Sequence, residues 1–187
     1  MNRVSVDQIL PIEKYEAVRP AMQQRVWFEK ARRRVHVGEH LTFLFENAET
    51  VRYQVQEMLR IERRSAPEDV AHEVATYNEL IGGPGELGCT LLIEIDDPAL
   101  RATKLAEWLE LPAHLYAKLA DGRLVRPVFD PRQVGETRVS SVHYLTFPVG
   151  DVAPVAIGAD HPTLTAETAF AVDQHAALQS DLDAARA

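Results

Sequence analysis

The stretch IGGPGELGCT, residues 81–90, marks the point at which the hydrophobic period of the chain changes. Before it, apolar side chains recur at the spacing of an α-helix, at positions 70, 74, 77 and 81. After it, apolar side chains occupy every second position from 87 to 95, which is the period of a β-strand. Gly82, Gly83 and Pro84 are typical of a helix end. The stretch therefore predicts a corner that leads from a helix into a strand.

The glycines at 83, 85 and 88 also match the G-x-G-x-x-G pattern of dinucleotide sites and approximate a phosphate-binding loop. Such a loop follows a strand and opens a helix, because the helix N-terminus must face the phosphate. Here the order is reversed, Cys89 stands where the lysine belongs, and Glu86 would repel a phosphate. We therefore predict no nucleotide cofactor. Asn78, Glu79 and Glu86 crowd this corner, and the sequence leaves open whether they brace the turn or line a site.

Upstream of the corner, the pattern predicts helices with one strand segment between them. Residues 7–34 are helical in pattern, with an interruption near Pro20, and residues 35–47 alternate as a strand does. Asn47 is suited to cap a helix over 48–63. Ser65 and Glu68 have the spacing of a capping box that would open a helix to about Leu80.

Downstream of the corner, the pattern predicts neighbouring strands. Residues 98–110 indicate a short helix, and residues 114–129 indicate a hairpin whose Asp121-Gly122 suits a type I′ turn. Residues 138–149 and 152–157 indicate two further strands, and the Ala-rich tail from Thr163 favours a helix. This order predicts an α+β fold in which N-terminal helices pack on a mainly antiparallel sheet, followed by a helical C-terminal tail. We expect a single domain over 1–187, with a helical part at 7–82, a sheet-rich part at 86–158 and a helix-prone tail at 163–187.

Composition and charge restrict the class of protein. The net charge of −8 argues against broad nucleic-acid binding, which depends on cations that neutralise phosphates. The one cysteine, Cys89, allows no internal disulfide and is consistent with a reducing cytoplasm. The sequence begins with charged residues where a signal peptide would be apolar, and it has no apolar run long enough to span a membrane. We expect a cytoplasmic protein.

Carboxylates and imidazoles suggest a metal site as one alternative. Glu68, His72 and Glu79 fall near one face of the third predicted helix, although such a face is also typical of a solvated surface. The chain has no Glu-x-x-His pair, so it is not a di-iron bundle of that type. Iron or another divalent metal would have ligands among residues that the fold brings together. The candidate ligands are His40, Glu46, Glu57, His72, Glu79 and Glu86.

Several other side chains have a structural and a functional interpretation. The basic run from Lys30 to Arg34 either complements a helix C-terminus or binds an anionic partner. Glu57 and Arg60 have the spacing of a surface ion pair. His143 shares a strand face with apolar residues, which favours a hydrogen-bonded core histidine over a catalytic one. Cys89 falls on an apolar face and is expected to be buried and unreactive.

Four segments resemble an uncharacterised bacterial family, a domain of unknown function of about this length. They are HLTFLFENAETVRYQVQEMLRIER (40–63), TYNELIGGPGELGCTLLIEI (76–95), FDPRQVGETRVSSVHYLTFPV (129–149) and GADHP (158–162). Genes of that family often lie beside those of rubrerythrin-like proteins and an iron–sulfur oxidoreductase, which implies a role in cytosolic redox or oxidative stress. The family offers no established catalytic residues, and it has Gln more often than His where His143 stands. Polar residues of these segments without a packing role are candidates for a site: Glu46, Glu57, Arg60, Asn78, Glu79, Glu86, Arg138, Asp160 and His161.

The sequence therefore supports three hypotheses and leaves the reaction, if any, undefined. The first is an accessory protein of a cytosolic redox system that binds a rubrerythrin-like or iron–sulfur protein without catalysis of its own. The second is a metal-dependent oxidoreductase or metal-binding protein with Glu and His ligands. The third is a small-molecule binding module with a pocket between the helices and the sheet.

Overall fold

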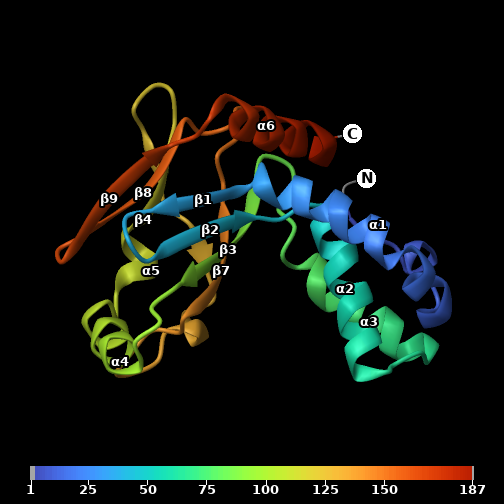
Figure 1. Ribbon diagram of the computed structural model, residues 1–187. Helices are drawn as coiled ribbons and strands as arrows, with labels where there is room; N and C mark the ends of the chain where they lie inside the picture. Colours follow the sequence, from blue (N-terminus) through green and yellow to red (C-terminus); the bar gives the residue numbers. More distant parts are fainter. Residues whose placement is uncertain (1–2, 187) are drawn as a thin grey trace.

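Three helices form an arm that stands away from two β-sheets (Figure 1). The computed structural model describes residues 3–186. The arm consists of α1 (Ile12–Ala31), α2 (Ala48–Glu62) and α3 (Pro67–Asn78), preceded by the 3-10 turn η1 (Val6–Gln8). Helices and antiparallel strands together confirm the predicted α+β class, with helices at the start and a helix at the end of the described chain.

The first sheet joins strands from distant parts of the chain in the order β1-β2-β3-β7-β6, and every neighbouring pair is antiparallel. Its members are β1 (Arg34–Val37), β2 (Leu41–Phe45), β3 (Leu87–Ile93), β7 (Val142–Phe147) and β6 (Val128–Phe129). In register, Phe43 lies opposite Leu91, and Leu91 lies opposite His143. One face of this sheet is therefore continuous and buried, which we call the inner face. The other, the outer face, carries Tyr144 and Val142.

The second sheet and the remaining helices cover the inner face. The sheet has the order β5-β4-β8-β9, with β5 (Leu124–Val125), β4 (Leu115–Lys118), β8 (Ala156–His161) and β9 (Leu164–Ala169). The other elements are α4 (Pro98–Glu107), α5 (Leu111–His114), η2 (Pro131–Gln133) and α6 (Val172–Arg186). Both sheets contribute to one apolar core together with Trp108, Leu178 and Leu182. We call this part of the molecule the sheet lobe.

The arm has a smaller apolar core of its own. It contains Val4, Val51, Val55, Leu59, Val74 and Ile81. The predicted cap of α2 is confirmed, because the Asn47 side chain accepts a hydrogen bond from the backbone N–H of Thr50 at 3.0 Å. The predicted cap of α3 is wrong: the N-cap residue is Ala66, and its first turn carries Pro67 instead of a capping box. No helix within residues 3–186 is both long and apolar enough to cross a membrane.

Two predictions about the helices at the start and end of the chain need correction. The N-terminal helix runs through Pro20 without a break. Pro20 is exposed, so the carbonyl group that its missing N–H leaves free can face water. The Ala-rich tail is not helical from Thr163: residues 164–169 form β9, and only α6 is helical. Pairing along the whole of β8 overrides the helix propensity of this short stretch.

Two further local predictions are modified. The 114–129 region does contain a β4–β5 hairpin, but its turn is not type I′, because Gly122 alone among its turn residues has positive φ, at 87°. The loop is closed instead by the N–H of Leu119, which donates to the carbonyl of Arg123 at 2.9 Å. The helix expected over 98–110 ends at Glu107, and the strand expected over 138–149 is regular only within β7.

Candidate functional site

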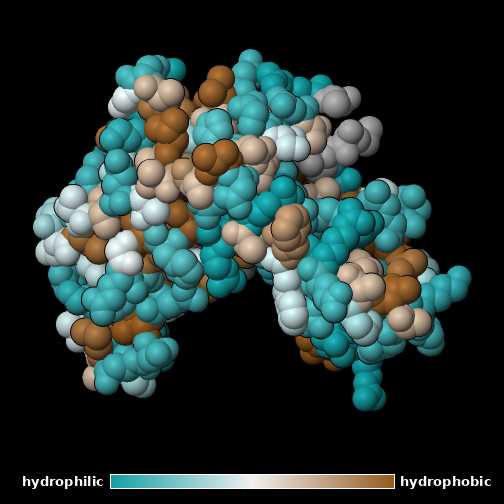
Figure 2. Space-filling view, turned by 45° about the horizontal axis from the view of Figure 1, so that its top comes forward, coloured by the Kyte–Doolittle hydropathy of each residue, from teal (hydrophilic) through white to brown (hydrophobic). Residues whose placement is uncertain are grey.

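A cleft separates the arm from the outer face of the first sheet (Figure 2). It consists of three adjoining hollows. The outer hollow, of about 600 Å³, lies between the end of α3 and strands β6 and β7. The inner hollow, of about 170 Å³, shares Tyr77, Leu80 and Tyr144 with it. The aromatic hollow, of about 400 Å³, shares Lys30 with the inner hollow and includes Trp27 and Tyr53. We use the word cleft for all three together.

Exposed aromatic and aliphatic side chains border this cleft. On the sheet side, strict alternation along β7 buries His143 and Leu145 and leaves Tyr144 49% exposed on the outer face. Val128 of the short edge strand β6 is 64% exposed. On the arm side, Trp27 at the end of α1 is 60% exposed. Trp and Tyr are enriched among the residues that dominate protein interfaces, so exposed aromatic side chains beside a hollow are candidate contact residues.

Charge is distributed unevenly along the cleft. Lys30 and Arg34 line the aromatic hollow, and the Lys30 ammonium lies 5.9 Å from the centre of the Tyr53 ring. Glu46 lines the inner hollow, and Glu79 lines the outer hollow. The cleft therefore has a cationic end at the C-terminus of α1 and carboxylates toward α3.

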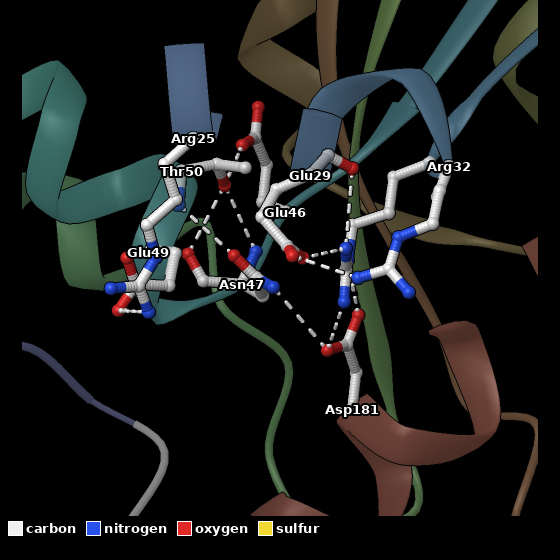
Figure 3. A network of polar contacts seen from close by, with 9 residues as sticks. Arg25, Glu29, Arg32, Glu46, Asn47, Glu49, Thr50 and Asp181 are labelled. Carbon is white, nitrogen blue, oxygen red and sulfur yellow. Dashed lines mark hydrogen bonds and ion pairs between the residues drawn. The ribbon is translucent and has the colours of Figure 1, made fainter. Parts of the chain in front are cut away.

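Glu46 is held in place by hydroxyl groups on both sides. The Thr50 hydroxyl donates to Glu46 Oε2 at 2.6 Å, and the Thr90 hydroxyl donates to Glu46 Oε1 at 3.0 Å. The side chain leaves the end of β2 beside the Asn47 cap, so the start of α2 fixes its direction. Its carboxylate points toward Thr50, away from the side where Arg32 and Asp181 lie (Figure 3). This orientation keeps the charge of Glu46 at the wall of the inner hollow.

A buried ion network fastens the arm to the sheet lobe at the end of the cleft (Figure 3). Arg33, whose side chain is 3% exposed, binds both oxygens of Asp181 on α6, at 2.7 and 2.8 Å. It also pairs with Glu29 of α1 at 2.5 Å, and Asn47 donates to Asp181 at 3.4 Å. Burial lowers the pKa of Arg33, but its contacts with Asp181 and Glu29 outweigh this and raise it. We call Glu29, Arg33, Asn47 and Asp181 the joint.

The joint changes the interpretation of the basic run. The guanidinium of Arg33 is occupied by partners inside the protein. Arg32 pairs with Glu29 at 2.7 Å and lies over the ring of Phe28. Only part of the predicted cationic patch, chiefly Lys30 and the exposed Arg34, is directed to a surface. The run is therefore mainly structural.

Glu57 and Arg60 do pair, at 3.1 Å, but inside a larger network than the sequence predicted. Glu57 also binds Arg19 at 2.7 and 3.0 Å and accepts a hydrogen bond from the Tyr15 hydroxyl at 2.5 Å. Hydrogen bonding from Arg19, with further bonds from Tyr15 and Arg60, lowers the pKa of Glu57 to about 2 against the opposing effect of burial. Arg60 adds a second contact to Glu16 at 3.6 Å. This network joins α1 to α2 and lies within the arm.

The corner at residues 81–90 is now resolved residue by residue. Asn78 is buried and holds the start of the chain, because it accepts from the N–H of Val4 at 2.9 Å and donates to the Val4 carbonyl at 2.8 Å. Glu86 accepts from the N–H of Gly83 at 3.0 Å and closes the turn. Glu79 is exposed and lines the outer hollow. Two of the three residues brace the corner, and the third faces the cleft.

The predicted metal ligands lie in separate parts of the molecule. His40 is in the turn before β2 and its ring lies 5.9 Å from that of Trp108, whereas His72 is exposed on α3. Glu46, Glu57, Glu79 and Glu86 occupy the places described above. Within residues 3–186, no three His, Cys, Asp or Glu side chains are placed to hold a metal ion together.

Asp160 and His161 belong to a polar cluster on the second sheet, far along the chain from the cleft residues. Asp160 pairs with Arg126 at 2.6 Å and with His114 at 3.3 Å. The rings of His114 and His161 meet edge to face, with their centres 5.2 Å apart. The guanidinium of Arg126 and the His114 contact lower the pKa of Asp160. Another candidate, Arg138, is exposed on the loop before β7 and does not contribute to either region.

Cys89 is buried as expected, and burial, with the charge of Glu46, raises the pKa of its thiol well above the usual value. His143 is fully buried, as expected for a core histidine, and the expectation that its ring is hydrogen-bonded is not confirmed. Neither ring nitrogen has a hydrogen-bond partner among the described residues, and burial lowers its pKa despite the nearby Ser140 backbone. Both groups are neutral components of the core.

Sequence reasoning missed the residues that border the cleft most openly. Trp27 falls within the helix predicted over 7–34 and Tyr144 within the strand predicted over 138–149, but the sequence pattern singled out neither side chain. The alternation along 142–147 carried the signal for Tyr144, since it falls opposite the apolar positions. Arg33 and Asp181 lie 148 positions apart, and no local pattern connects them.

Comparisons with known proteins agree with this fold and add no activity. A model of the family described as "Protein of unknown function (DUF3501)" matches residues 3–182. A crystal structure of a novel protein of unknown function from Burkholderia pseudomallei K96243 is 32% identical, with a TM-score of 0.88 over 96% of this chain and 99% of that chain. No curated protein matches the sequence.

Proposed function

Because the chain belongs to the DUF3501 family of unknown function, we propose its role from its own geometry: it is an accessory protein that binds a partner protein in the cleft, without catalysis of its own. The observation that carries this proposal is the row of exposed side chains that borders the cleft. Trp27 and Tyr144 stand 60% and 49% exposed on its two sides. Trp, Tyr and Arg are the residue types that dominate the energetics of protein interfaces.

The strongly perturbed groups of the protein support a binding role. A catalytic acid or base needs a pKa near the working pH and access to a substrate. The Glu57 carboxyl has a pKa of about 2 and is occupied by Arg19, Tyr15 and Arg60. The Cys89 thiol is buried, with a pKa raised away from the reactive range. In this proposal the Glu57 carboxyl and the Cys89 thiol stabilise the structure.

The partner belongs, in this proposal, to a cytosolic redox or oxidative-stress system. A rubrerythrin-like protein or an iron–sulfur oxidoreductase is the candidate, on the ground of the four segments whose resemblance implies such neighbours. The geometry is compatible with this class of partner because the aromatic border and the two charged ends of the cleft suit a protein surface.

A small molecule is the second candidate occupant. The outer hollow of about 600 Å³ lies within the size range of ligand pockets, and it is bordered by Tyr77, Phe129 and Tyr144. Metal binding by the predicted Glu and His ligands stays a prediction. Metal analysis of protein purified without chelators tests it, and less than about a tenth of an equivalent of iron, zinc or manganese would count against it.

Calorimetric titration of the purified chain with the rubrerythrin-like and iron–sulfur candidates tests the main proposal. We expect micromolar binding that weakens about tenfold or more in Tyr144→Ala and in Trp27→Ala, since interface aromatics commonly contribute more than 1.4 kcal/mol. Val172→Ala is the matched control, because Val172 is 89% exposed at the start of α6 and lies outside the cleft. The proposal would be contradicted if the chain bound neither candidate. It would also be contradicted if Tyr144→Ala and Trp27→Ala bound a candidate as tightly as the wild type does.

A further inference from the structure

We infer that the inner hollow is an anchor pocket for one basic side chain, an arginine or lysine of the partner, whose charge is met by Glu46. The inference rests on the proposed function and specifies its chemistry. It starts from the polar contacts of Glu46 and from the residues that line the hollow around it.

Glu46 differs from Glu49 and Glu57, the neighbouring glutamates of α2, in having no cationic partner. Glu49 pairs with Arg25 at 3.3 Å and with Arg52 at 3.0 Å, and Glu57 pairs with Arg19 and Arg60. Glu46 receives only the hydroxyls of Thr50 and Thr90, and it forms no ion pair within residues 3–186. A partly buried carboxylate is costly unless it is paired. Glu46 is therefore a charge whose counter-charge is missing from the described chain.

The carboxylate has the capacity to accept that counter-charge. Two carboxylate oxygens offer about four acceptor positions, of which the two threonine hydroxyls use two. The remaining positions lie on a group whose direction is fixed by the Asn47 cap and by β3. A fixed carboxylate suits the planar fork of a guanidinium, which can donate two parallel hydrogen bonds, and it also suits an ammonium.

The rest of the inner hollow matches the body of a basic side chain. Leu44, Leu92, Tyr77 and Tyr144 are among the residues that line it. Apolar walls cover the methylene stem, and tyrosine faces attract a guanidinium. A volume of about 170 Å³ is close to the roughly 150 Å³ cavity that holds a benzene molecule. The hollow therefore has room for one guanidinium or ammonium group with part of its stem.

Lys30 also lines this hollow, and its ammonium would repel a second cation. Its charge is directed to the Tyr53 ring, and Arg34 lies in the same aromatic hollow. A partner segment that satisfies both ends has an acidic residue over Lys30 and Arg34 and a basic residue at Glu46. This pattern sets the direction in which the segment crosses the cleft, with its acidic part toward α1 and its basic part toward α3.

Titration of the ¹⁵N-labelled full chain with n-butylguanidinium chloride, followed by NMR, tests the pocket directly. We expect millimolar binding, with amide shifts centred on Thr90, Gln54 and Tyr144. Glu46→Gln should weaken it by about tenfold or more, because charge-assisted bonds to a carboxylate are lost. N-butylurea, which is neutral and of similar shape, should produce no such shifts. Equal shifts from the two compounds, or unchanged affinity in Glu46→Gln, would overturn the inference.

Matched variants separate loss of charge from loss of fold. Glu49→Gln removes a carboxylate from α2 outside the inner hollow, and it should bind n-butylguanidinium as the wild type does. Thermal unfolding tests whether Glu46→Gln is folded. Tyr144→Leu leaves Glu46 in place and removes one aromatic side chain from the hollow, so it should lower the affinity for n-butylguanidinium. This variant also tests the pocket if Glu46→Gln proves unstable. An unchanged affinity in Tyr144→Leu would contradict the stacking part of the inference.

The partner titration distinguishes the two proposals. If Tyr144→Ala and Trp27→Ala weaken partner binding while Glu46→Gln binds the partner as tightly as the wild type, the anchor inference is overturned and the proposed function stands. If the cleft variants leave partner binding unchanged, the proposed function fails. The n-butylguanidinium titration then still shows whether Glu46 receives a cation.

Discussion

The sheet lobe and the arm are held together by different forces. The core of the sheet lobe is apolar and continuous, and it collects side chains from both sheets, from Trp108 and from α6. The arm has a small apolar core and relies on specific polar contacts, among them Asn78 with the Val4 backbone and Gln56 with the Leu10 backbone. Apolar contacts tolerate change of shape better than hydrogen bonds tolerate loss of a partner. Stability is therefore concentrated in the sheet lobe, whereas the geometry of the arm depends on a few residues.

Phe43→Ala addresses the lobe and has the largest expected effect. Phe43 is fully buried at the centre of the first sheet, opposite Leu91. Its loss should lower the free energy of unfolding by about 3–5 kcal/mol, because a large cavity is left in a packed core. Urea unfolding followed by circular dichroism measures this. Val142→Ala, on the exposed face of the same sheet, is the control and should change the value by less than about 0.5 kcal/mol.

Arg33→Met addresses the joint between the two regions. The substitution keeps an unbranched side chain but leaves Asp181 and Glu29 without their buried cation. We expect a loss of about 3 kcal/mol in the free energy of unfolding, at the low end of values for a broken buried pair, because both carboxylates retain some exposure. In this variant, hydrogen exchange should accelerate more for the backbone amides at the C-terminal end of α1 than for those of β3. A uniform acceleration across the chain would indicate that the lobe and the arm unfold as one unit.

Glu57→Gln addresses the polar network of the arm and should depend on pH. The pKa of Glu57 is about 2 in the folded state against the usual value of 4.5. A lowered pKa stabilises the fold above the unfolded pKa, and this contribution is lost as the pH falls from about 4.5 toward 2. We expect the variant to be about 2 kcal/mol less stable than the wild type at pH 7, after allowance for the partly exposed Arg19. Urea unfolding at pH 7 and near pH 2 measures the difference, which should disappear at the lower pH. A difference that persists at low pH would show that shape, and not charge, is what Glu57 contributes.

Tyr144→Ala has the smallest expected effect on stability, because Tyr144 is 49% exposed and only its backbone binds Gln133. The free energy of unfolding should change by less than about 0.5 kcal/mol, although the same substitution is expected to weaken partner binding. Thermal unfolding and binding titration of one preparation measure both. A large loss of stability would show that the Tyr144 side chain contributes to the packed core.

Much of the fold follows from local pattern. The change of period at residues 81–90, the Asn47 cap and the strand character of β2 and β3 are each visible within a few residues of sequence, and the structure confirms them. The expected alternation of buried and exposed residues is absent from β2 and nearly absent from β3, because both faces of these strands are buried. The failures occur where distant residues decide. The stretch 164–169 is Ala-rich and locally helix-prone, but pairing with β8 makes it a strand in which alternate residues are half-buried.

The site was less predictable than the fold. Glu46 and Glu79 were candidates, and both line the cleft. The spacing predicted the Glu57–Arg60 pair, but no local pattern indicated that Arg19 and Tyr15 would also bind Glu57. The exposure of Trp27 depends on which face of α1 packs against α2, and the weak apolar stripe of α1 buries only Tyr15 and Val26. A cleft is formed by the angle between two parts of the molecule, so no single segment contains its signal.

The distance along the chain between the two halves of the joint has a consequence for biosynthesis. Arg33 and Asp181 are 148 positions apart, so at ribosomal rates of about 5–20 residues per second roughly 7–30 s pass between the synthesis of one and of the other. Until Asp181 has been made, Glu29 is the one carboxylate of the joint that is available to Arg33. The arm is therefore synthesised early, and its ion pair with the sheet lobe can form only after α6 has been made.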